Sequence, residues 1–202
     1  MENNELLNII SLDQQLLLYI NSLNSPFWDE VMYVISGSLV WVPLYLAILT
    51  FTAIRYRKKF FVILPFIILA IALADLSSVH LFKNIVQRLR PCHEPALEGL
   101  VHIVRGKCGG AYSFVSSHAA NCFCAATVSS LFLGKRWFST AMVCWAAIIG
   151  YSRIYLGVHY PGDVICGAAL GFIVGWGVFR LYEIADVRVF SHSAYFTTSM
   201  KT

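Results

Sequence analysis

Long apolar stretches without charged residues restrict how this chain can fold more than any other feature. Val31–Ile54 contains no Asp, Glu, Lys or Arg, and neither does Ala111–Gly134. A helix needs about 20 consecutive apolar residues to cross a bilayer, and both stretches are long enough. Phe60–Ala74, Trp137–Ser152 and Val164–Phe179 are also apolar enough, with their flanks, to form spanning helices. The sequence therefore predicts an all-α integral membrane bundle of about five transmembrane helices.

The overall composition supports this class. Hydrophobic residues make up 58% of the chain and charged residues 13%, whereas soluble domains contain about 45–50% and about 25% respectively. No basic helix, finger or aromatic platform indicates nucleic-acid binding.

Two terminal segments differ from the apolar stretches. Asp, Gln and Asn interrupt the leucines and isoleucines of Leu6–Leu23. We therefore expect an amphipathic helix in the membrane interface, with a sixth span as the alternative. We expect one membrane-embedded domain over residues 1–185 and a mobile cytoplasmic tail over residues 186–202.

Basic residues orient the bundle. Nine lie in the loops and tail at one end of the expected helices: Arg55, Arg57, Lys58, Lys59, Lys135, Arg136, Arg180, Arg188 and Lys201. Because short loops rich in Lys and Arg remain in the cytoplasm, we assign this end to the cytoplasm and the opposite end to the outer side, which would be the periplasm if the membrane is a bacterial inner membrane. That end nevertheless carries six basic residues: Lys83, Arg88, Arg90, Arg105, Lys107 and Arg153. Such an excess favours an anion-binding site there.

Cysteines and glycines add two expectations. Cys92 and Cys108 share the long periplasmic loop, where an oxidising environment permits disulfides, and we predict that they form one. The other cysteines lie within expected helices and are interpreted as small buried residues: Cys122, Cys124, Cys144 and Cys166. Gly167, Gly171 and Gly175 recur every four residues, a spacing that indicates close packing against a neighbouring helix.

Three polar segments are expected to meet at the periplasmic end. In the first, Lys83 and Arg90 are separated by nearly two helical turns, which places them on one face of a helix. Pro91 then limits the continuation of that helix. Taken alone, the two cations also fit basic side chains that extend from a helix end to the interface.

The second segment opens the third apolar stretch. Ser116 or Ser117 caps the first turn of the expected helix, and the free N–H groups of that turn favour an anion. His118 follows directly. Alone, this pattern fits a helix cap beside a surface histidine.

The third segment leads into the last apolar stretch. Pro161 suits the first helical position, and Asp163 suits the first turn. A carboxylate four residues after His159 can hold one ring nitrogen as N–H and leave the other as a nucleophilic lone pair. With Arg153 and the other two segments, this set suits phosphoryl transfer, which depends on positioning and on electrostatic stabilisation. The sequence contains no clear cage of metal ligands, and arginine forks can hold phosphate oxygens instead.

These segments resemble the signature of the type 2 phosphatidic acid phosphatase superfamily: K-x6-R-P, then P-S-G-H, then S-R-x5-H-x3-D. The first and third motifs are complete in this chain: Lys83-x6-Arg90-Pro91 and Ser152-Arg153-x5-His159-x3-Asp163. The second departs twice, because Val115 replaces the proline and Ser117 replaces the glycine. The superfamily also includes the vanadium haloperoxidases, but those enzymes are soluble, so the apolar composition favours the membrane branch.

The resemblance implies a role for each matched residue. His159 would be the nucleophile that forms a phosphohistidine, Asp163 would orient it, and His118 would protonate the leaving oxygen. The remaining matched residues would hold the phosphate: Lys83, Arg90, Ser116, Ser117 and Arg153. The family requires no metal or other cofactor, and we expect no obligatory protein partner.

The expected position of the site indicates the substrate class. A site at the membrane boundary suits a lipid whose phosphate reaches the water, and the chain resembles short bacterial members that act on envelope lipids. We expect lipid A, at its 4′-phosphate, ahead of undecaprenyl diphosphate and of phosphatidylglycerophosphate. Arg88, Arg105 and Lys107 favour a large or multiply anionic headgroup. A non-catalytic lipid-phosphate carrier is the alternative class, but a carrier would not need an oriented His159–Asp163 pair.

Overall fold

The computed structural model describes the backbone of residues 2–199 and the side chains of residues 11–186. The described chain is helical and contains no strand; one isolated bridge joins Leu89 to Tyr112. The α-helices are α1 (Glu2–Ser22), α2 (Pro26–Ser36), α3 (Val42–Tyr56), α4 (Phe60–Ser77), α5 (Asn84–Val86), α6 (Ser117–Leu133), α7 (Arg136–Tyr155) and α8 (Pro161–Ser199). The expected all-α class is therefore confirmed.

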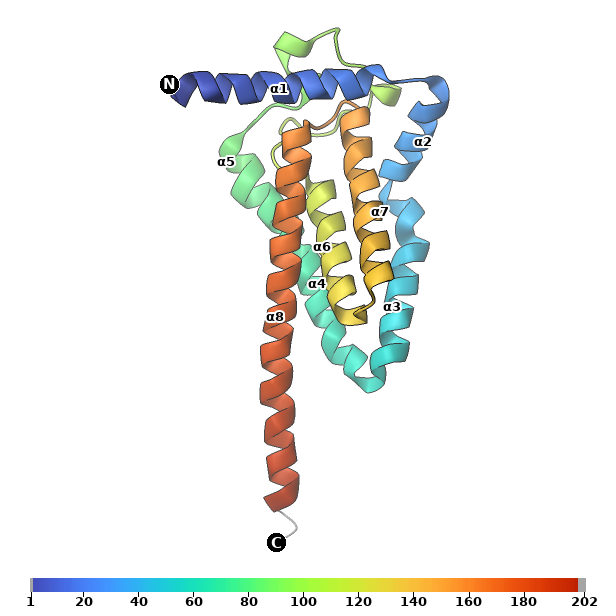
Figure 1. Ribbon diagram of the computed structural model, residues 1–202, viewed down its shortest axis with the longest axis vertical. Helices are drawn as coiled ribbons and strands as arrows, with labels where there is room; N and C mark the ends of the chain where they lie inside the picture. Colours follow the sequence, from blue (N-terminus) through green and yellow to red (C-terminus); the bar gives the residue numbers. More distant parts are fainter. Residues whose placement is uncertain (1, 200–202) are drawn as a thin grey trace.

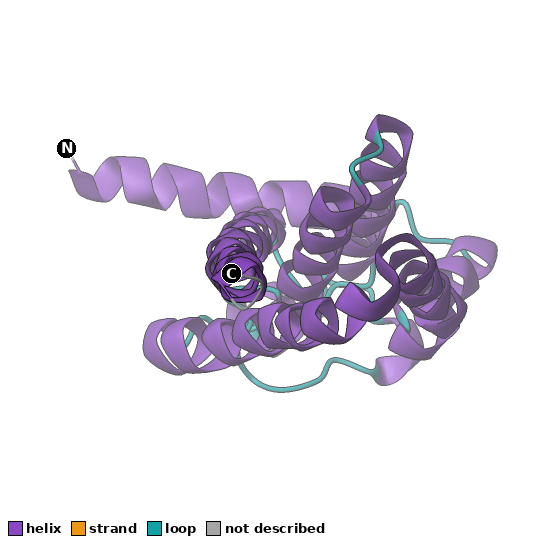
Figure 2. Cartoon of the chain, turned by 90° about the horizontal axis from the view of Figure 1, so that it is seen from below, coloured by secondary structure: helices purple, strands orange, loops and turns teal. Residues whose placement is uncertain are grey.

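The long helices run along one axis, and α1 lies across one end of them (Figure 1). The turns that join α3 to α4 and α6 to α7 lie at the opposite end (Figure 1). Viewed from below, α8 is seen nearly end-on, and α1 extends sideways past it (Figure 2). The loops of residues 87–116 and 156–160 lie at the α1 end of the bundle, and part of the first loop passes above α1 in the view of Figure 1.

Two described stretches are long and apolar enough to cross a membrane, Ser38–Val86 and Pro161–Asp186. The first is not one straight helix. It reverses at a 3₁₀ turn, Arg57–Lys59, where Arg57 adopts φ 50°, so α3 and α4 are its two antiparallel legs.

Two expected helices begin later than the apolar pattern indicates. Val31–Ile54 is interrupted, because α2 ends at Ser36 and Gly37 is extended before a 3₁₀ turn, Ser38–Trp41. Pro43 in the first turn of α3 explains the new start, since proline lacks the N–H that a continuous helix would use. In Ala111–Gly134 the helix begins only at Ser117.

The glycine stripe brings α8 against α6. A Cβ on Gly171 would lie 2.2 Å from the Ala120 carbonyl oxygen, and one on Gly175 would lie 3.0 Å from that of Cys124. The two helices therefore approach backbone to backbone, which confirms that the stripe is a packing surface. Below this contact, the side chains of Phe132 and Tyr182 are buried together.

Other expectations need correction or fall outside the description. Cys144 and Cys166 are exposed on the outside of the bundle rather than buried, although Cys122 and Cys124 are buried as expected. Helix α8 continues to Ser199, and the expected mobile cytoplasmic tail over residues 186–202 stays a prediction. The side chains of the expected tail from residue 187 on lie outside the described residues.

Candidate active site

The first motif follows an irregular path. After α4, a π-helical turn, Ser78–Lys83, carries Lys83, and the helix ends at Val86 because Gln87 is left-handed, with φ 49° and ψ 30°. Arg90 therefore does not share a helical face with Lys83, contrary to the expectation. Arg90 lies on an extended segment, and its backbone N–H donates to the Ala111 carbonyl oxygen over 2.9 Å.

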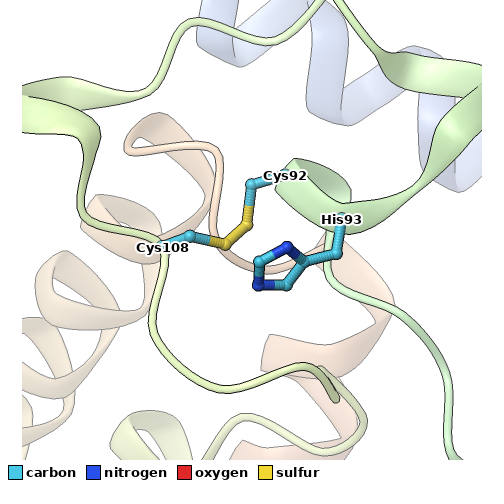
Figure 3. Close-up of side chains that lie close together, drawn as sticks. All are labelled: Cys92, His93 and Cys108. Atoms are coloured by element: carbon cyan, nitrogen blue, oxygen red, sulfur yellow. A yellow bond between two sulfur atoms is a disulfide. The ribbon is translucent and has the colours of Figure 1, made fainter.

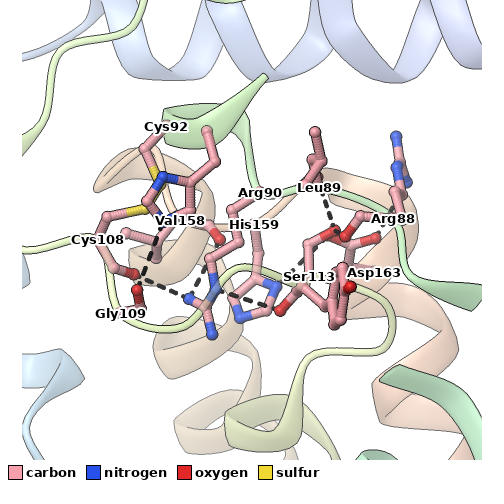
Figure 4. Close-up of a disulfide and its surroundings, with 12 residues drawn as sticks. Arg88, Leu89, Arg90, Cys92, Cys108, Gly109, Ser113, Val158, His159 and Asp163 are labelled. Atoms are coloured by element: carbon pink, nitrogen blue, oxygen red, sulfur yellow. Dashed lines mark hydrogen bonds and ion pairs between the residues drawn. A yellow bond between two sulfur atoms is a disulfide. The ribbon is translucent and has the colours of Figure 1, made fainter. Parts of the chain in front are cut away.

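The Arg90 side chain is held from three sides. It is 8% exposed and donates to the carbonyl oxygens of Tyr112 at 3.3 Å, Cys108 at 3.1 Å and Val158 at 3.4 Å. Figure 4 shows its guanidinium between the disulfide and His159. The long loop therefore carries a phosphate-binding candidate and also orients it.

Cys92 and Cys108 are joined by a disulfide, with their Cα atoms 6.2 Å apart. The His93 ring lies beside the two sulfur atoms (Figure 3). Two cysteines and a histidine this close could suggest a metal centre, but here the sulfur atoms are bonded to each other. The geometry therefore fits a covalent closure of the loop rather than a metal cage.

The second motif caps α6. Ser116, which is fully buried, is the N-cap residue, and its side chain accepts from the Ala119 N–H. The Ser117 hydroxyl accepts from the Lys83 ammonium over 2.8 Å and shares a 2.7 Å hydrogen bond with Ser78. In place of the family glycine, Ser117 thus contributes a hydroxyl that positions Lys83 while its backbone remains helical.

The third motif pairs a histidine with a carboxylate. His159 Nδ1 lies 3.4 Å from Asp163 Oδ2, and this oxygen also accepts from the Tyr160 N–H over 3.0 Å. Pro161 begins α8 and Asp163 lies in its first turn, as expected. Because Nδ1 faces the carboxylate, Nε2 is the ring nitrogen left for substrate.

Arg153 approaches from α7. Its Nη1 donates to the Ser36 hydroxyl, and its buried Nε has no hydrogen-bond partner within the described structure. His118 lies in the first turn of α6, and the N–H of Ser116 at the start of that helix donates to the Asp163 carbonyl oxygen over 3.0 Å. The three motifs therefore meet at one end of the bundle.

The electrostatics of the site favour a neutral His159. Burial lowers the pKa of His159 well below its usual range, and the charges of Arg90, Arg153 and Lys83 lower it further, against a smaller opposing effect of the Ser113 backbone. A neutral imidazole has a free lone pair at physiological pH. The same three cations attract an anion, so the arrangement places a candidate nucleophile beside a candidate anion-binding site.

An apolar pocket leads from this site between α3, α4 and α6. Its volume is about 500 Å³, and its upper wall includes Ser117 and His118. Most of the other lining residues are apolar, including Ile48, Ile67 and Val128. The pocket thus offers apolar walls next to the candidate leaving-group acid.

Two of the three additional cations of the outer loop form ion pairs. Arg88 contacts the carboxylates of Asp163 and Asp13. Arg105 contacts Glu30, and the Lys107 ammonium donates to the Tyr33 hydroxyl over 2.9 Å. Whether these three residues also contribute to headgroup binding stays a prediction. The sequence analysis also missed Ser36, Ser78 and Asp13, because no local pattern reveals a partner so distant along the chain.

Comparisons with known proteins agree with this geometry. Residues 62–185 match the family model described as PAP2 superfamily. The chain is 41% identical to "Lipid A 4'-phosphatase" of Bacteroides thetaiotaomicron, over 82% of this chain and 74% of the relative. It is 33% identical to a protein of the same name from Porphyromonas gingivalis, over 89% and 77%. The crystal structure of a transmembrane PAP2 type phosphatidylglycerolphosphate phosphatase from Bacillus subtilis superposes with a TM-score of 0.67 at 27% identity, over 87% of each chain.

Proposed function

The chain belongs to the PAP2 superfamily, and on that premise we propose that it removes the 4′-phosphate from lipid A. The observation that carries the proposal is the buried pair of His159 and Asp163, with Nδ1 3.4 Å from Oδ2. Lys83, Arg90 and Arg153 act on His159 with their charges, and Ser117 and His118 line the neighbouring apolar pocket. The two relatives named lipid A 4′-phosphatase support the choice of lipid.

The proposed reaction has two steps. His159 Nε2 attacks phosphorus, the bond from phosphorus to the sugar oxygen breaks, and His118 gives its proton to that oxygen. Water then attacks the phosphohistidine, gives a proton back to His118, and inorganic phosphate leaves. Asp163 holds the imidazole in position and stabilises the positive charge that forms on it.

The proposed phosphate cradle surrounds the attacked phosphorus. Lys83, Arg90 and Arg153 bind the equatorial oxygens, whose charge is spread in the transition state. Ser116 adds a hydroxyl, and the Ser117 backbone amide takes the place of the family's glycine amide. Donors fixed in advance in a partly dry site stabilise such charge more strongly than water does.

The proposed membrane topology has five spans, α3, α4, α6, α7 and α8, with α1 in the interface. The basic turn Arg57–Lys59 lies at the end of the bundle opposite the site (Figure 1), which supports a cytoplasmic location for that end. The disulfide on the site's side supports a periplasmic location for the active centre. The enzyme would thus work at the outer face of a bacterial inner membrane.

Phosphate release from purified protein tests the proposal. Lipid A, undecaprenyl diphosphate and phosphatidylglycerophosphate are offered in matched detergent micelles, with His159→Ala as the control. We expect release from lipid A at the highest kcat/KM, and a loss of several orders of magnitude in the variant. Faster release from undecaprenyl diphosphate would assign the enzyme to that lipid instead. Equal release by His159→Ala would refute the mechanism, and lipid binding without release would indicate a carrier.

A further inference from the structure

Arg88 joins two carboxylates from opposite ends of the chain. Its Nη1 donates to Asp163 Oδ1 over 3.0 Å, and its Nη2 donates to Asp13 Oδ2 over 2.8 Å. The Asp163 side chain is 0% exposed, that of Asp13 is 13% exposed, and that of Arg88 is 24% exposed. Both ion pairs are thus largely shielded from water, where charge-assisted hydrogen bonds are strong and directional.

The Arg88 guanidinium is also fixed from a third direction. Its central carbon lies 3.7 Å from the centre of the Tyr160 ring, and Tyr160 is 1% exposed. Such stacking suits the planar guanidinium and limits its rotation. Arg88 therefore holds Asp163 at a defined angle, while the other Asp163 oxygen faces His159.

Asp13 anchors the same assembly from α1. Its Oδ1 accepts from the Gly162 N–H over 2.7 Å, at the start of α8 and next to Asp163. A Cβ on Gly162 would lie 3.0 Å from Asp13 Oδ2 and 3.3 Å from Oδ1, so the absence of a side chain at Gly162 permits the contact. Asp13 thus contacts both Arg88, which holds the Asp163 side chain, and the backbone of Gly162, which precedes Asp163.

We propose that Asp13 and Arg88 are positioning residues for catalysis, which set Asp163 and through it the ring of His159. Asp13 lies outside residues 62–185, which match the family model, so helix α1 completes the active centre from beyond the family region. The proposal rests on the proposed phosphatase activity and adds a requirement for α1. In this proposal the charge of Arg88 holds the Asp163 carboxylate in place and does not bind the lipid headgroup.

The expected kinetic effect follows from the geometry. Neither Asp13 nor Arg88 occupies the proposed phosphate cradle, so their loss changes kcat and leaves KM within about twofold. Displacing a reacting group by about 1 Å costs on the order of 100-fold in rate. We therefore expect Arg88→Gln, which removes the direct contact to Asp163, to lower kcat about 10–100-fold. Asp13→Asn acts on Asp163 indirectly and should lower kcat about 3–10-fold.

A mutant cycle separates positioning from stability. Asp13→Asn, Arg88→Gln and the double variant are compared in kcat, KM, single-turnover phosphohistidine formation and melting temperature. The side-chain oxygen of the Asp13→Asn variant can still accept from the Gly162 N–H, so this variant loses only the ion pair with Arg88. Adding it to Arg88→Gln should therefore change kcat less than about twofold. Asp13→Glu should restore part of the rate, and Gly162→Ala should reproduce the kcat effect of Asp13→Asn by displacing its carboxylate. Glu30→Gln, which breaks the Arg105 ion pair in the outer region of the structure, is the control with unchanged kcat.

The outcomes distinguish this inference from the proposed function. An active wild type whose Asp13→Asn and Arg88→Gln variants keep the wild-type kcat would refute the inference alone. So would variants that lower only the melting temperature, or independent multiplicative losses of kcat in the double variant. A wild-type protein that releases phosphate from none of the three lipids would refute the proposed function and the inference with it.

Discussion

Gly171→Ala tests whether the helix contact that carries the active site is as tight as the structure shows. The added Cβ would lie 2.2 Å from the Ala120 carbonyl oxygen and 2.8 Å from the Cys124 nitrogen. Ordinary contacts of this kind are about 3.5–4.0 Å, so α8 must move away from α6 by more than about 1 Å. Overpacking of this kind costs about 1–3 kcal/mol in the free energy of unfolding.

The same displacement should reduce catalysis. Asp163 lies at the start of α8 and His118 at the start of α6, so separating the helices moves the proposed nucleophile pair away from the proposed acid. A shift of about 1 Å lowers kcat on the order of 100-fold. Thermal unfolding in detergent and steady-state phosphate release measure the two effects in one preparation.

Gly177→Ala is the matched control. It introduces the same methyl group in the same helix, where no heavy atom lies within 4 Å of the new Cβ. We expect unchanged kcat and a free energy of unfolding equal to or about 0.5–1 kcal/mol above the wild type, because alanine favours a helix over glycine. If Gly171→Ala behaves like Gly177→Ala in both measurements, the close approach of α6 and α8 is refuted.

Three further predictions concern the site. Replacing both Cys92 and Cys108 by Ala removes a cross-link between residues 16 apart. We expect the loop to lose about 3 kcal/mol of stability in hydrogen exchange and KM to rise as Arg90 loosens; free alkylation of both thiols in unreduced, denatured wild type would contradict the bridge. Ser117→Gly should keep kcat within about tenfold, since it removes one hydrogen bond to Lys83, and complete inactivity would show that the hydroxyl is indispensable. The pKa of His159 is lowered in the folded state, so as the pH falls below about 6.5 the histidine is protonated in the unfolded chain but not in the folded one. The free energy of unfolding should therefore drop by up to about 1.4 kcal/mol per pH unit below that pH. His159→Gln, whose side chain does not titrate, should lack this part of the pH dependence in thermal unfolding.

The candidate residues of the site could be predicted because those of each motif lie close together in the sequence. His159 and Asp163 are four residues apart, just before and inside the start of α8, so their pairing needs only local geometry. The starts of α6 and α8 follow from Ser116 as a cap and Pro161 as a first helical residue. Local rules of this kind are recognisable in one sequence.

The long-range contacts were not predictable. The left-handed conformation of Gln87 turns the chain and sends Arg90 to the site along an extended segment, although a regular helix was the simplest interpretation. The contact from Asp13 to Arg88 crosses 75 residues of sequence, and no periodicity reports such a distance. For the same reason the sequence linked Arg88 only to an anionic headgroup, since the fold alone reveals its two carboxylate partners.

Mass spectrometry of lipid A tests most directly whether this chain is a lipid A 4′-phosphatase that works through His159. Lipid A is compared between cells that carry the intact gene, a deletion, or the His159→Ala allele expressed at the same level. We predict that intact cells contain lipid A without the 4′-phosphate, whereas the deletion and the His159→Ala allele retain that phosphate. Identical lipid A in all three strains, or a loss of phosphate that persists with His159→Ala, would contradict the assignment.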